Sequence, residues 1–306
     1  MKLTKRKVRI HLVMQGRLGN QLFQLCAAKG VIKAFEERAH VQVICHNMSE
    51  TSLTAASIVG LSDFDIFPLD SLICRLYRSN NKFLQIPFII RRNLLLRIKR
   101  EVVENTKPCE LNSFPPPRNL LIHSTFQNTN WLGFVDPTEP IVQRKKKLGE
   151  LLRTNSPEKA TILGLHFSFG DFLNPNLVRE YGYLSSRYYE ESLHEVLQEK
   201  RIDKIVVFSE DKELAIQRIN EMQTLNTITR GSIEVSHSRD YNLAPHDELL
   251  LMSMCDALIL SNSSFSWWGA YLAKESTLVV APEPIYRRVN KEDVVKGNWT
   301  RVYGYD

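Results

Sequence analysis

Residues 247–272 read DELLLMSMCDALILSNSSFSWWGAYL, and this segment is the most informative about the fold. Its apolar residues predict a helix over 247–254, a buried strand over 257–260 and a second helix that begins near Ser266. The same rhythm continues on both sides. Strands are predicted at 161–166, 204–208, 233–235 and 277–281, and helices at 187–199 and 211–222. Strands that alternate with helices indicate a parallel sheet covered on both faces, which binds ligands at the carboxyl ends of its strands.

The first half of the chain opens in the same way, with a buried strand over 8–14, a turn that contains glycine and a helix from about 20 to 37. Further strands are predicted at 41–45 and 120–123, and a charged helix at 139–152. The polar segment 153–159 contains Ser-Pro and is the best domain boundary. We therefore expect two α/β domains, 1–155 and 156–306.

Composition excludes several classes of protein. With 306 residues, 13 Gly and 13 Pro, the chain is neither collagen-like nor of low complexity. No run of 18 apolar residues is present, so no transmembrane helix is expected, and the apolar stretch after the basic start is too short for a signal peptide. The five cysteines are scattered without C-x-x-C spacing, which favours reduced, mostly buried thiols and a cytoplasmic protein.

Three loops fall where a doubly wound fold places its functional residues. The first is Gly16-Arg17-Leu18-Gly19-Asn20-Gln21, where two glycines allow close approach to a ligand and Asn20 can cap the following helix. It is neither G-x-G-x-x-G nor a P-loop, and an ordinary strand-to-helix turn is the alternative. The second, from His166 to Asp171, leaves a strand end, although a histidine there can also be purely structural.

The third loop offers the strongest anion site. It places four hydroxyls and one amide at a predicted helix N-terminus, where free N–H groups and the helix dipole favour negative charge. Ordinary capping by Ser264 or Ser266 is the alternative, but one or two hydroxyls would suffice for that. An uncharged hydroxyl cluster beside aromatic residues suits a nucleoside diphosphate. The residues of this loop are Ser261, Asn262, Ser263, Ser264, Phe265 and Ser266.

Two other patterns carry less weight. Asp63-Phe64-Asp65 is a D-x-D, which binds metal in some sugar transferases, but it lies in an apolar stretch of the other domain. A serine hydrolase would need the nucleophile elbow G-x-S-x-G, which the sequence lacks. We expect no metal site from these patterns.

Taken together, the loops resemble the α-1,2-fucosyltransferase family, glycosyltransferase family 11. Residues 16–24 resemble its N-terminal G-[GR]-[LM]-G-N-Q-x-F-Q motif, Phe126-Gln127 its aromatic-Phe-Gln segment, and residues 208–211 its F-S-[DE]-D motif. The longest similarity is the opening stretch 247–272, which contains the family's NSSFSWW motif.

The resemblance implies a two-domain GT-B-like fold with Rossmann-like parallel sheets. It also implies a metal-independent, inverting transfer of L-fucose from GDP-β-L-fucose to the 2-hydroxyl of a galactoside. Residues 261–266 would then hold the nucleotide and its phosphates, Asp211 would shape the nucleotide pocket, and Asn20 would lie near the reacting centre. By position, His166 and Asp171 are the candidates for a general base. The remaining expected substrate contacts are Gly16, Arg17, Gly19 and Gln21.

One departure from the family pattern affects the prediction. The family reads H-x-R-R-G-D in the second loop, and Ser168 and Phe169 stand here at the arginine positions. Charge-assisted hydrogen bonds contribute ~1.5–3 kcal/mol each, so this loss matters for a departing diphosphate. Three explanations stay open: another cation such as Arg17, Arg179 or Arg287 replaces the arginines, the nucleotide sugar differs, or the protein binds sugar nucleotides or glycans without catalysis.

The charge distribution suggests the partners. Residues 1–155 carry 24 basic and 12 acidic side chains, whereas residues 156–306 carry 16 and 22. Segment 71–100 has eight basic residues and no acid, which indicates either a solvated face or contact with an anionic membrane surface. No aromatic-interleaved motif supports nucleic-acid binding. The expected partners are a nucleotide sugar and a galactoside glycan, free or lipid-linked, for a bacterial surface polysaccharide made on the cytoplasmic side of the membrane.

Overall fold

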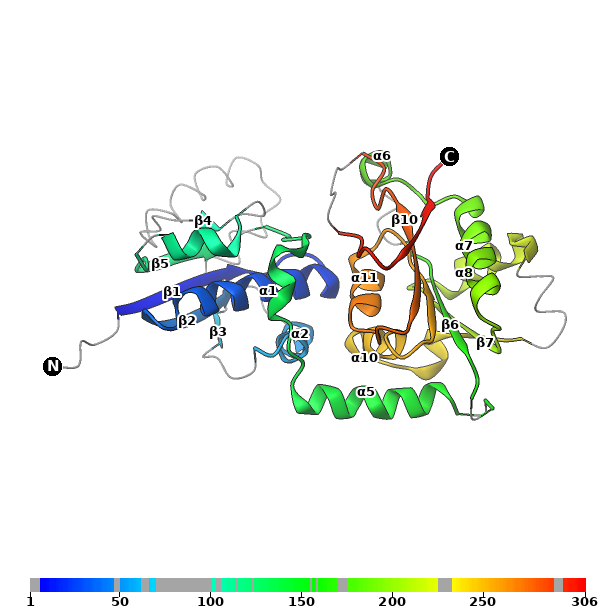
Figure 1. Cartoon of the computed structure of the whole chain (residues 1–306), viewed down its shortest axis with the longest axis horizontal. Coiled ribbons are helices and arrows are strands. Elements are labelled where there is room, and N and C mark those ends of the chain that lie inside the picture. The colour runs from blue at the N-terminus through cyan, green and yellow to red at the C-terminus, as the bar shows by residue number, and fades with distance from the viewer. Residues whose placement is uncertain are drawn as a thin grey trace. The chain divides into compact units, whose positions relative to one another are not determined.

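The computed structural model describes most of the chain, and Figure 1 shows its helices and strands, most of them labelled. The described residues are 6–46, 50–61, 66–69, 101–102, 106–113, 115–122, 124–154, 156–157, 159–169, 175–224, 233–288 and 294–306. They form two compact units, Met1–Ile141 and Val142–Asp306.

The first unit contains a parallel sheet in the order β3-β2-β1-β5-β4. In the central strand β1, Val8, Ile10, His11 and Leu12 are buried, and only its first two residues are exposed. Helix α1 is buried along most of its length and follows β1 directly. The elements are β1 (Arg6–Val13), α1 (Leu18–Phe35), β2 (Ala39–His46), α2 (Glu50–Ile58), β3 (Ile66–Leu69), β4 (Glu101–Val102), the 3₁₀ turns η1 (Pro108–Ser113) and η2 (Thr129–Phe134), and β5 (Asn119–Ile122).

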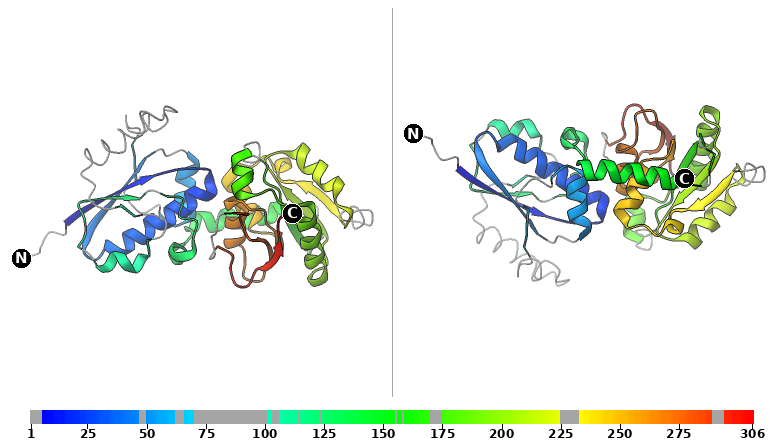
Figure 2. Two further views of the ribbon diagram at one scale, coloured as in Figure 1. Left: turned by 90° about the horizontal axis from the view of Figure 1, so that it is seen from above. Right: turned by 90° about the horizontal axis from the view of Figure 1, so that it is seen from below.

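The second unit contains six parallel strands in the order β11-β10-β9-β6-β7-β8. Counted along the unit, this is the order 6-5-4-1-2-3, the doubly wound arrangement of dinucleotide-binding folds. Helices α7 and α8 lie on one face of the sheet and α10 and α11 on the other (Figures 1 and 2). The strands are β6 (Ile162–His166), β7 (Lys204–Phe208), β8 (Glu234–His237), β9 (Ala257–Ile259), β10 (Leu278–Glu283) and β11 (Thr300–Tyr303). The helices are α5 (Glu139–Leu152), α6 (Pro175–Tyr181), α7 (Ser186–Glu199), α8 (Lys212–Glu221), η3 (Ser238–Tyr241), α10 (Pro245–Met252) and α11 (Ser264–Tyr271).

The burial of the central strands explains why they could be predicted from the sequence. Strands β6, β7 and β9 are buried at every residue, because helices cover both faces of a parallel sheet. Their apolar side chains form one core with those of α7, including Tyr188, Leu193 and Val196. The pattern of apolar runs therefore predicted these strands within a residue or two of their actual bounds.

The compact units divide earlier than the expected boundary at 155/156. Most of α5 belongs with the second unit, because its side chains bond to that unit. Arg144 forms an ion pair with Asp247, and Lys145 donates to the carbonyl oxygen of Leu272. The Ser-Pro segment at 156–157 lies between α5 and β6 and is part of that unit.

Within the part of the chain that the structure describes, no helix is both long and apolar enough to span a bilayer. Cys26, Cys45 and Cys255 are buried free thiols, and burial raises the pKa of each. Cys109 is free and exposed. The expected reduced, mostly buried thiols are present at these four positions.

Candidate active site

The predicted site residues of the second unit lie at the carboxyl ends of β6 and β9, where the strand order changes direction. Strands β6 and β9 are hydrogen-bonded neighbours, and the chain continues from β6 to β7 on one side and from β9 to β10 on the other. Loops leaving the carboxyl ends of two such strands part from each other and open a crevice for ligands. At this point the Nδ1 atom of His166, the last residue of β6, lies 2.7 Å from the Oγ atom of Ser261, which follows β9. The fold thus joins two predicted site residues that are 95 positions apart.

His166 is held as a neutral ring. Its side chain is only 5% exposed, and the ring of Phe265 stacks on it at 5.7 Å between centroids. Burial lowers the pKa of His166 to about 4, although the carboxylate of Glu210 acts in the opposite direction. A neutral imidazole cannot supply positive charge to a diphosphate, but it can orient the Ser261 hydroxyl.

In the serine-rich loop, some side chains form hydrogen bonds within the protein and others do not. Helix α11 begins at Ser264, two residues earlier than expected, and Ser263 is its cap, accepting from the amide of Phe265 at 3.2 Å. Ser266 is fully buried and donates back to the carbonyl oxygens of Ser261 and Ser263. Ser264 is half-buried, and its hydroxyl makes no hydrogen bond to the described residues. Neither of the two serines proposed as plain caps therefore caps the helix.

Asn262 has a different local role from the one expected. Its side-chain Nδ2 atom donates to the carbonyl oxygens of Tyr181 and Gly182 at 3.1 and 2.9 Å and lies 3.4 Å from the hydroxyl of Tyr305. The residue is 8% exposed. Its amide nitrogen therefore ties the loop after β9 to the segment between α6 and α7.

The loop after β6 continues the aromatic core where the family pattern has arginines. The ring of Phe169 stacks on Phe167 with centroids 6.0 Å apart and 18° between planes, and the Phe169 amide donates to Glu210 at 2.9 Å. Ser168 and Phe169 are both half-buried. Gly170 and Asp171 lie outside the described residues.

The loop after β7 contains a residue that the motif reading missed. Asp211 caps helix α8 by accepting from the amide of Leu214 at 2.9 Å, so its carboxylate already has a backbone donor. Its neighbour Glu210 is exposed, accepts from the Phe169 amide and acts on the charge of His166. The signal was present in the sequence, since Glu210 lies two residues after the strand end at Phe208, within the F-S-[DE]-D motif.

An arginine that was not among the predicted site residues also lies at the carboxyl edge of the sheet. Arg239, in η3 after β8, is exposed and places an NH2 group 3.3 Å from the carbonyl oxygen of Glu210. Arg287, which follows β10, is also exposed and donates to the carbonyl oxygen of Asp306 at 3.0 Å. Arg179 is exposed on α6. Arg239 and Arg287 follow strands β8 and β10, and Arg179 lies on the helix after β6. All three therefore lie in segments that leave the carboxyl edge of the sheet.

The first unit has an equivalent change in strand order, between β1 and β5. The amide nitrogen of Gln127, beyond β5, donates to the Oδ1 atom of Asn20 at 2.6 Å. Gln24, fully buried, closes the loop after β1 by pairing with both backbone polar groups of Gln15 at 3.0 and 3.4 Å. Two motif segments that are far apart in sequence therefore meet at this sheet edge.

Asn20 does not cap helix α1, contrary to expectation. The helix begins at Leu18 with Arg17 in the capping position, where no side chain bonds to the first turn. Gly16 has φ +72°, and a Cβ atom there would lie 2.5 Å from the Asn20 Nδ2 atom, so the glycine is required. Gln21 donates to the Gly16 carbonyl at 3.1 Å, and Gly19 is buried in the first helical turn.

Some sequence predictions cannot be placed. Asp63 and Asp65 lie outside the described residues, as does the basic segment 71–100. Among the residues that the structure describes, no group of three or more His, Cys, Asp or Glu side chains is arranged to hold a metal ion.

Comparison with known proteins finds relatives over most of the chain. Residues 109–303 match the model of Glycosyl transferase family 11. The chain is 24% identical over 306 aligned positions to the O-antigen biosynthesis glycosyltransferase WbnK of Escherichia coli, with 94% of this chain and 98% of that protein covered. It is 22% identical to an alpha-1,2-colitosyltransferase of Escherichia coli, with 94% and 97% covered.

Among solved structures, the ADP-heptose lipopolysaccharide heptosyltransferase II of Escherichia coli has a TM-score of 0.50 at 11% identity. The match covers 97% of this chain and 90% of that one, and it concerns the fold alone. The expected two-domain fold and the expected family are both confirmed. The chain belongs to glycosyltransferase family 11 and is a glycosyltransferase with a GT-B-like fold of two α/β units.

Proposed function

We propose that this enzyme transfers L-fucose, or a related deoxysugar such as colitose, from its GDP carrier to the 2-hydroxyl of a galactoside. The observation that carries the proposal is the similarity, over 94% of the chain, to proteins named as an alpha-1,2-colitosyltransferase and an O-antigen glycosyltransferase. The acceptor would be a bacterial surface glycan, free or lipid-linked. The reaction would take place on the cytoplasmic side of the membrane.

The second unit would hold the donor at the crevice between β6 and β9. The hydroxyl of Ser264, the amide groups of the first turn of α11 and its helix dipole would face the diphosphate. The pair His166–Ser261 would fix the floor of this site, since both residues are buried and 2.7 Å apart. Asn262 would hold the loop after β9 in place through its bond to the Gly182 carbonyl.

The reaction would be an inverting displacement. The acceptor hydroxyl attacks the anomeric carbon as the GDP leaves from the opposite face, and the hydroxyl proton passes to a base. With a pKa of about 4, His166 is a poor base and suits a positioning role. Asp171 is then the remaining candidate base, and Asn20, held by Gln127, would orient the acceptor.

The developing charge on the diphosphate needs a cation. Ser168 and Phe169 cannot supply one, and Phe169 is packed against Phe167. Exposed arginines in neighbouring loops of the same unit, namely Arg179, Arg239 and Arg287, are the replacements we propose. Because they and the helix dipole would neutralise the leaving group, we expect no metal requirement.

The test begins with thermal-shift measurements on the full chain with GDP, UDP, dTDP and CMP sugars. We expect stabilisation by GDP alone and by GDP-fucose or GDP-colitose. Incubation with a β-galactoside, followed by NMR of the product, should show a new 2-linked deoxysugar, unchanged by EDTA. Stabilisation by UDP or dTDP sugars alone, or a product linked elsewhere, would contradict the proposal.

A sugar-nucleotide-binding protein without catalysis is the second candidate. The specific observation in its favour is the aromatic packing at Phe169, where the family pattern has an arginine. Binding of GDP sugars without GDP release across a broad panel of galactoside acceptors would favour it. Turnover that disappears in Arg239→Gln or Arg287→Gln would exclude it.

A further inference from the structure

A groove of about 480 Å³ lies along helix α5. It lies at the amino ends of the strands, whereas the predicted donor site lies at their carboxyl ends. Across from α5, its walls come from the turns that carry Met254 and Lys274, which precede β9 and β10. Strands in a parallel sheet share their amino edge, and His166 and Ser261 lie at the carboxyl edge. The groove is therefore a separate feature of the second unit. It is lined by Val142, Lys145, Lys146, Gly149, Glu150, Arg153, Met254 and Lys274.

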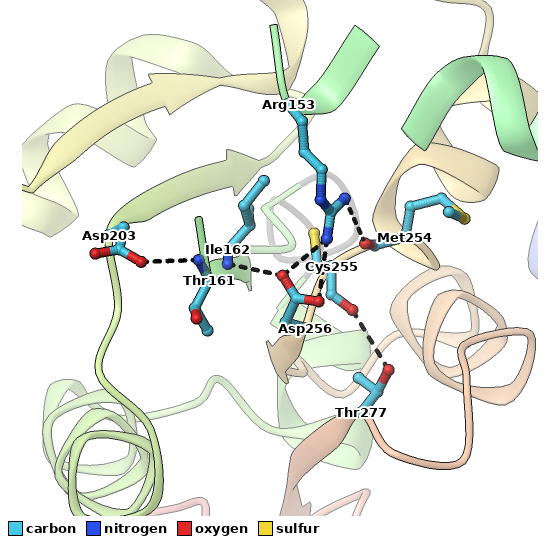
Figure 3. Close-up of polar contacts among 8 residues, drawn as sticks. All are labelled: Arg153, Thr161, Ile162, Asp203, Met254, Cys255, Asp256 and Thr277. Atoms are coloured by element: carbon cyan, nitrogen blue, oxygen red, sulfur yellow. Dashed lines mark hydrogen bonds and ion pairs between the residues drawn. The ribbon is translucent and has the colours of Figure 1, made fainter. Parts of the chain in front are cut away.

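Arg153 fastens α5 to this edge of the sheet, as Figure 3 shows. Its guanidinium bonds to both carboxylate oxygens of Asp256 at 3.0 and 2.9 Å and lies 3.4 Å from the Met254 carbonyl. Asp256 also accepts from the amide of Ile162, the first residue of β6, at 3.0 Å. The groove is thus built on a fixed frame, and the charge of Arg153 is already neutralised.

The remaining lysines leave the groove with uncompensated positive charge. Lys145 is partly buried and donates to the carbonyl of Leu272. Burial lowers its pKa, and the charge of Lys274 lowers it further, so the two ammonium groups repel each other. Lys146 and Lys274 are exposed and form no ion pair within the described chain. Glu150 is the single acid among the lining residues, so the groove favours an anion.

The floor of the groove is apolar. Val142 is 47% exposed at its rim, although it is a large aliphatic residue. A Cβ atom on Gly149 would lie 2.6 Å from the Met254 methyl group, so the glycine lets Met254 pack directly against the helix backbone. Exposed Val142 beside basic side chains at the rim matches the boundary between lipid phosphates and acyl chains. Free phosphate or nucleic acid would leave the exposed Val142 without an apolar partner.

We propose that this groove docks the second unit on an anionic phospholipid membrane, with Lys145, Lys146 and Lys274 on the head groups and Val142 at the acyl boundary. The proposal does not depend on which sugar the enzyme transfers. It also differs from contact through the basic segment 71–100, because it assigns the contact to other residues.

The experiment is flotation of the full chain with phosphatidylcholine vesicles that contain or lack phosphatidylglycerol. We expect flotation only with phosphatidylglycerol, weakened by salt. Each neutralised lysine should lower the partition coefficient about fivefold, so Lys146→Gln/Lys274→Gln should lower it about thirtyfold. Val142→Asp should weaken binding as well, because it removes the apolar contact and adds a negative charge.

The matched control is Lys147→Gln/Lys159→Gln, which removes the same charge from exposed lysines of the same unit outside the groove. It should float nearly as well as the unmodified protein. Circular dichroism and GDP binding should be unchanged in all variants. Equal loss in control and groove variants, no loss in the groove variant, or equal flotation without phosphatidylglycerol would each overturn the proposal.

Discussion

The buried His166 makes the stability of the second unit depend on pH. In the folded state burial lowers its pKa from 6.5 to about 4, whereas in the unfolded chain the ring titrates near 6.5. Below pH 6.5 the unfolded chain therefore binds a proton that the folded protein does not, and stability falls as the pH falls. The loss stops below about pH 4, where both states are protonated.

The size of the effect follows from this difference in pKa. Between pH 7.5 and 5.5 the free energy of unfolding should drop by about 1.3 kcal/mol, and by about 3 kcal/mol at the acid limit. His166→Gln removes the titrating ring and keeps a polar partner for Ser261. His11 and His237 also have lowered pKa values, but both are present in either protein and cancel in the comparison.

The assay is urea denaturation at both pH values, monitored by tryptophan fluorescence. Three of the four tryptophans, Trp267, Trp268 and Trp299, lie in the second unit, so the signal reports mainly on its unfolding. The wild type should lose about 1.3 kcal/mol more than His166→Gln between the two pH values. Equal losses, or an NMR titration of the His166 ring near 6.5, would refute the reasoning.

Three further substitutions test the two sites. Asn262→Ala removes the donor to two backbone carbonyls, so we expect the free energy of unfolding to fall by about 2–3 kcal/mol and the Tm in calorimetry to be clearly lower. A Tm equal to that of the wild type would contradict this structural role. Gly16→Ala places a side chain on a left-handed backbone and against Asn20, so we expect it to destabilise the first unit by about 1–3 kcal/mol in chemical denaturation. Gly133→Ala is the control, because a Cβ atom there meets nothing within 4 Å. Phe169→Arg restores a cation near the donor site at the cost of its stacking on Phe167, so GDP affinity by calorimetry should rise about tenfold while Tm falls, and unchanged affinity would show that the diphosphate lies elsewhere.

The local sequence determined most elements of the second unit. Buried strands such as β6 and β7 are continuous apolar runs because a parallel sheet is covered on both faces, and this signal needs no long-range information. The elements that were missed, α2, β3, β4, α6 and β11, are short or lie at sheet edges. There, packing from neighbouring elements decides the structure more than the periodicity of a few residues does.

The family and the candidate loops were also predicted from the sequence, because those loops follow directly from strand ends. What each side chain does in these loops depends on the three-dimensional fold. It paired His166 with Ser261 across 95 residues, used Asn262 to bind backbone carbonyls, and brought Gln127 to Asn20. Hydrogen-bond partners far apart in sequence depend on strand order and register, which no local pattern contains. For the same reason the groove on α5 could not be foreseen, since its apolar floor comes from a methionine more than 100 residues away.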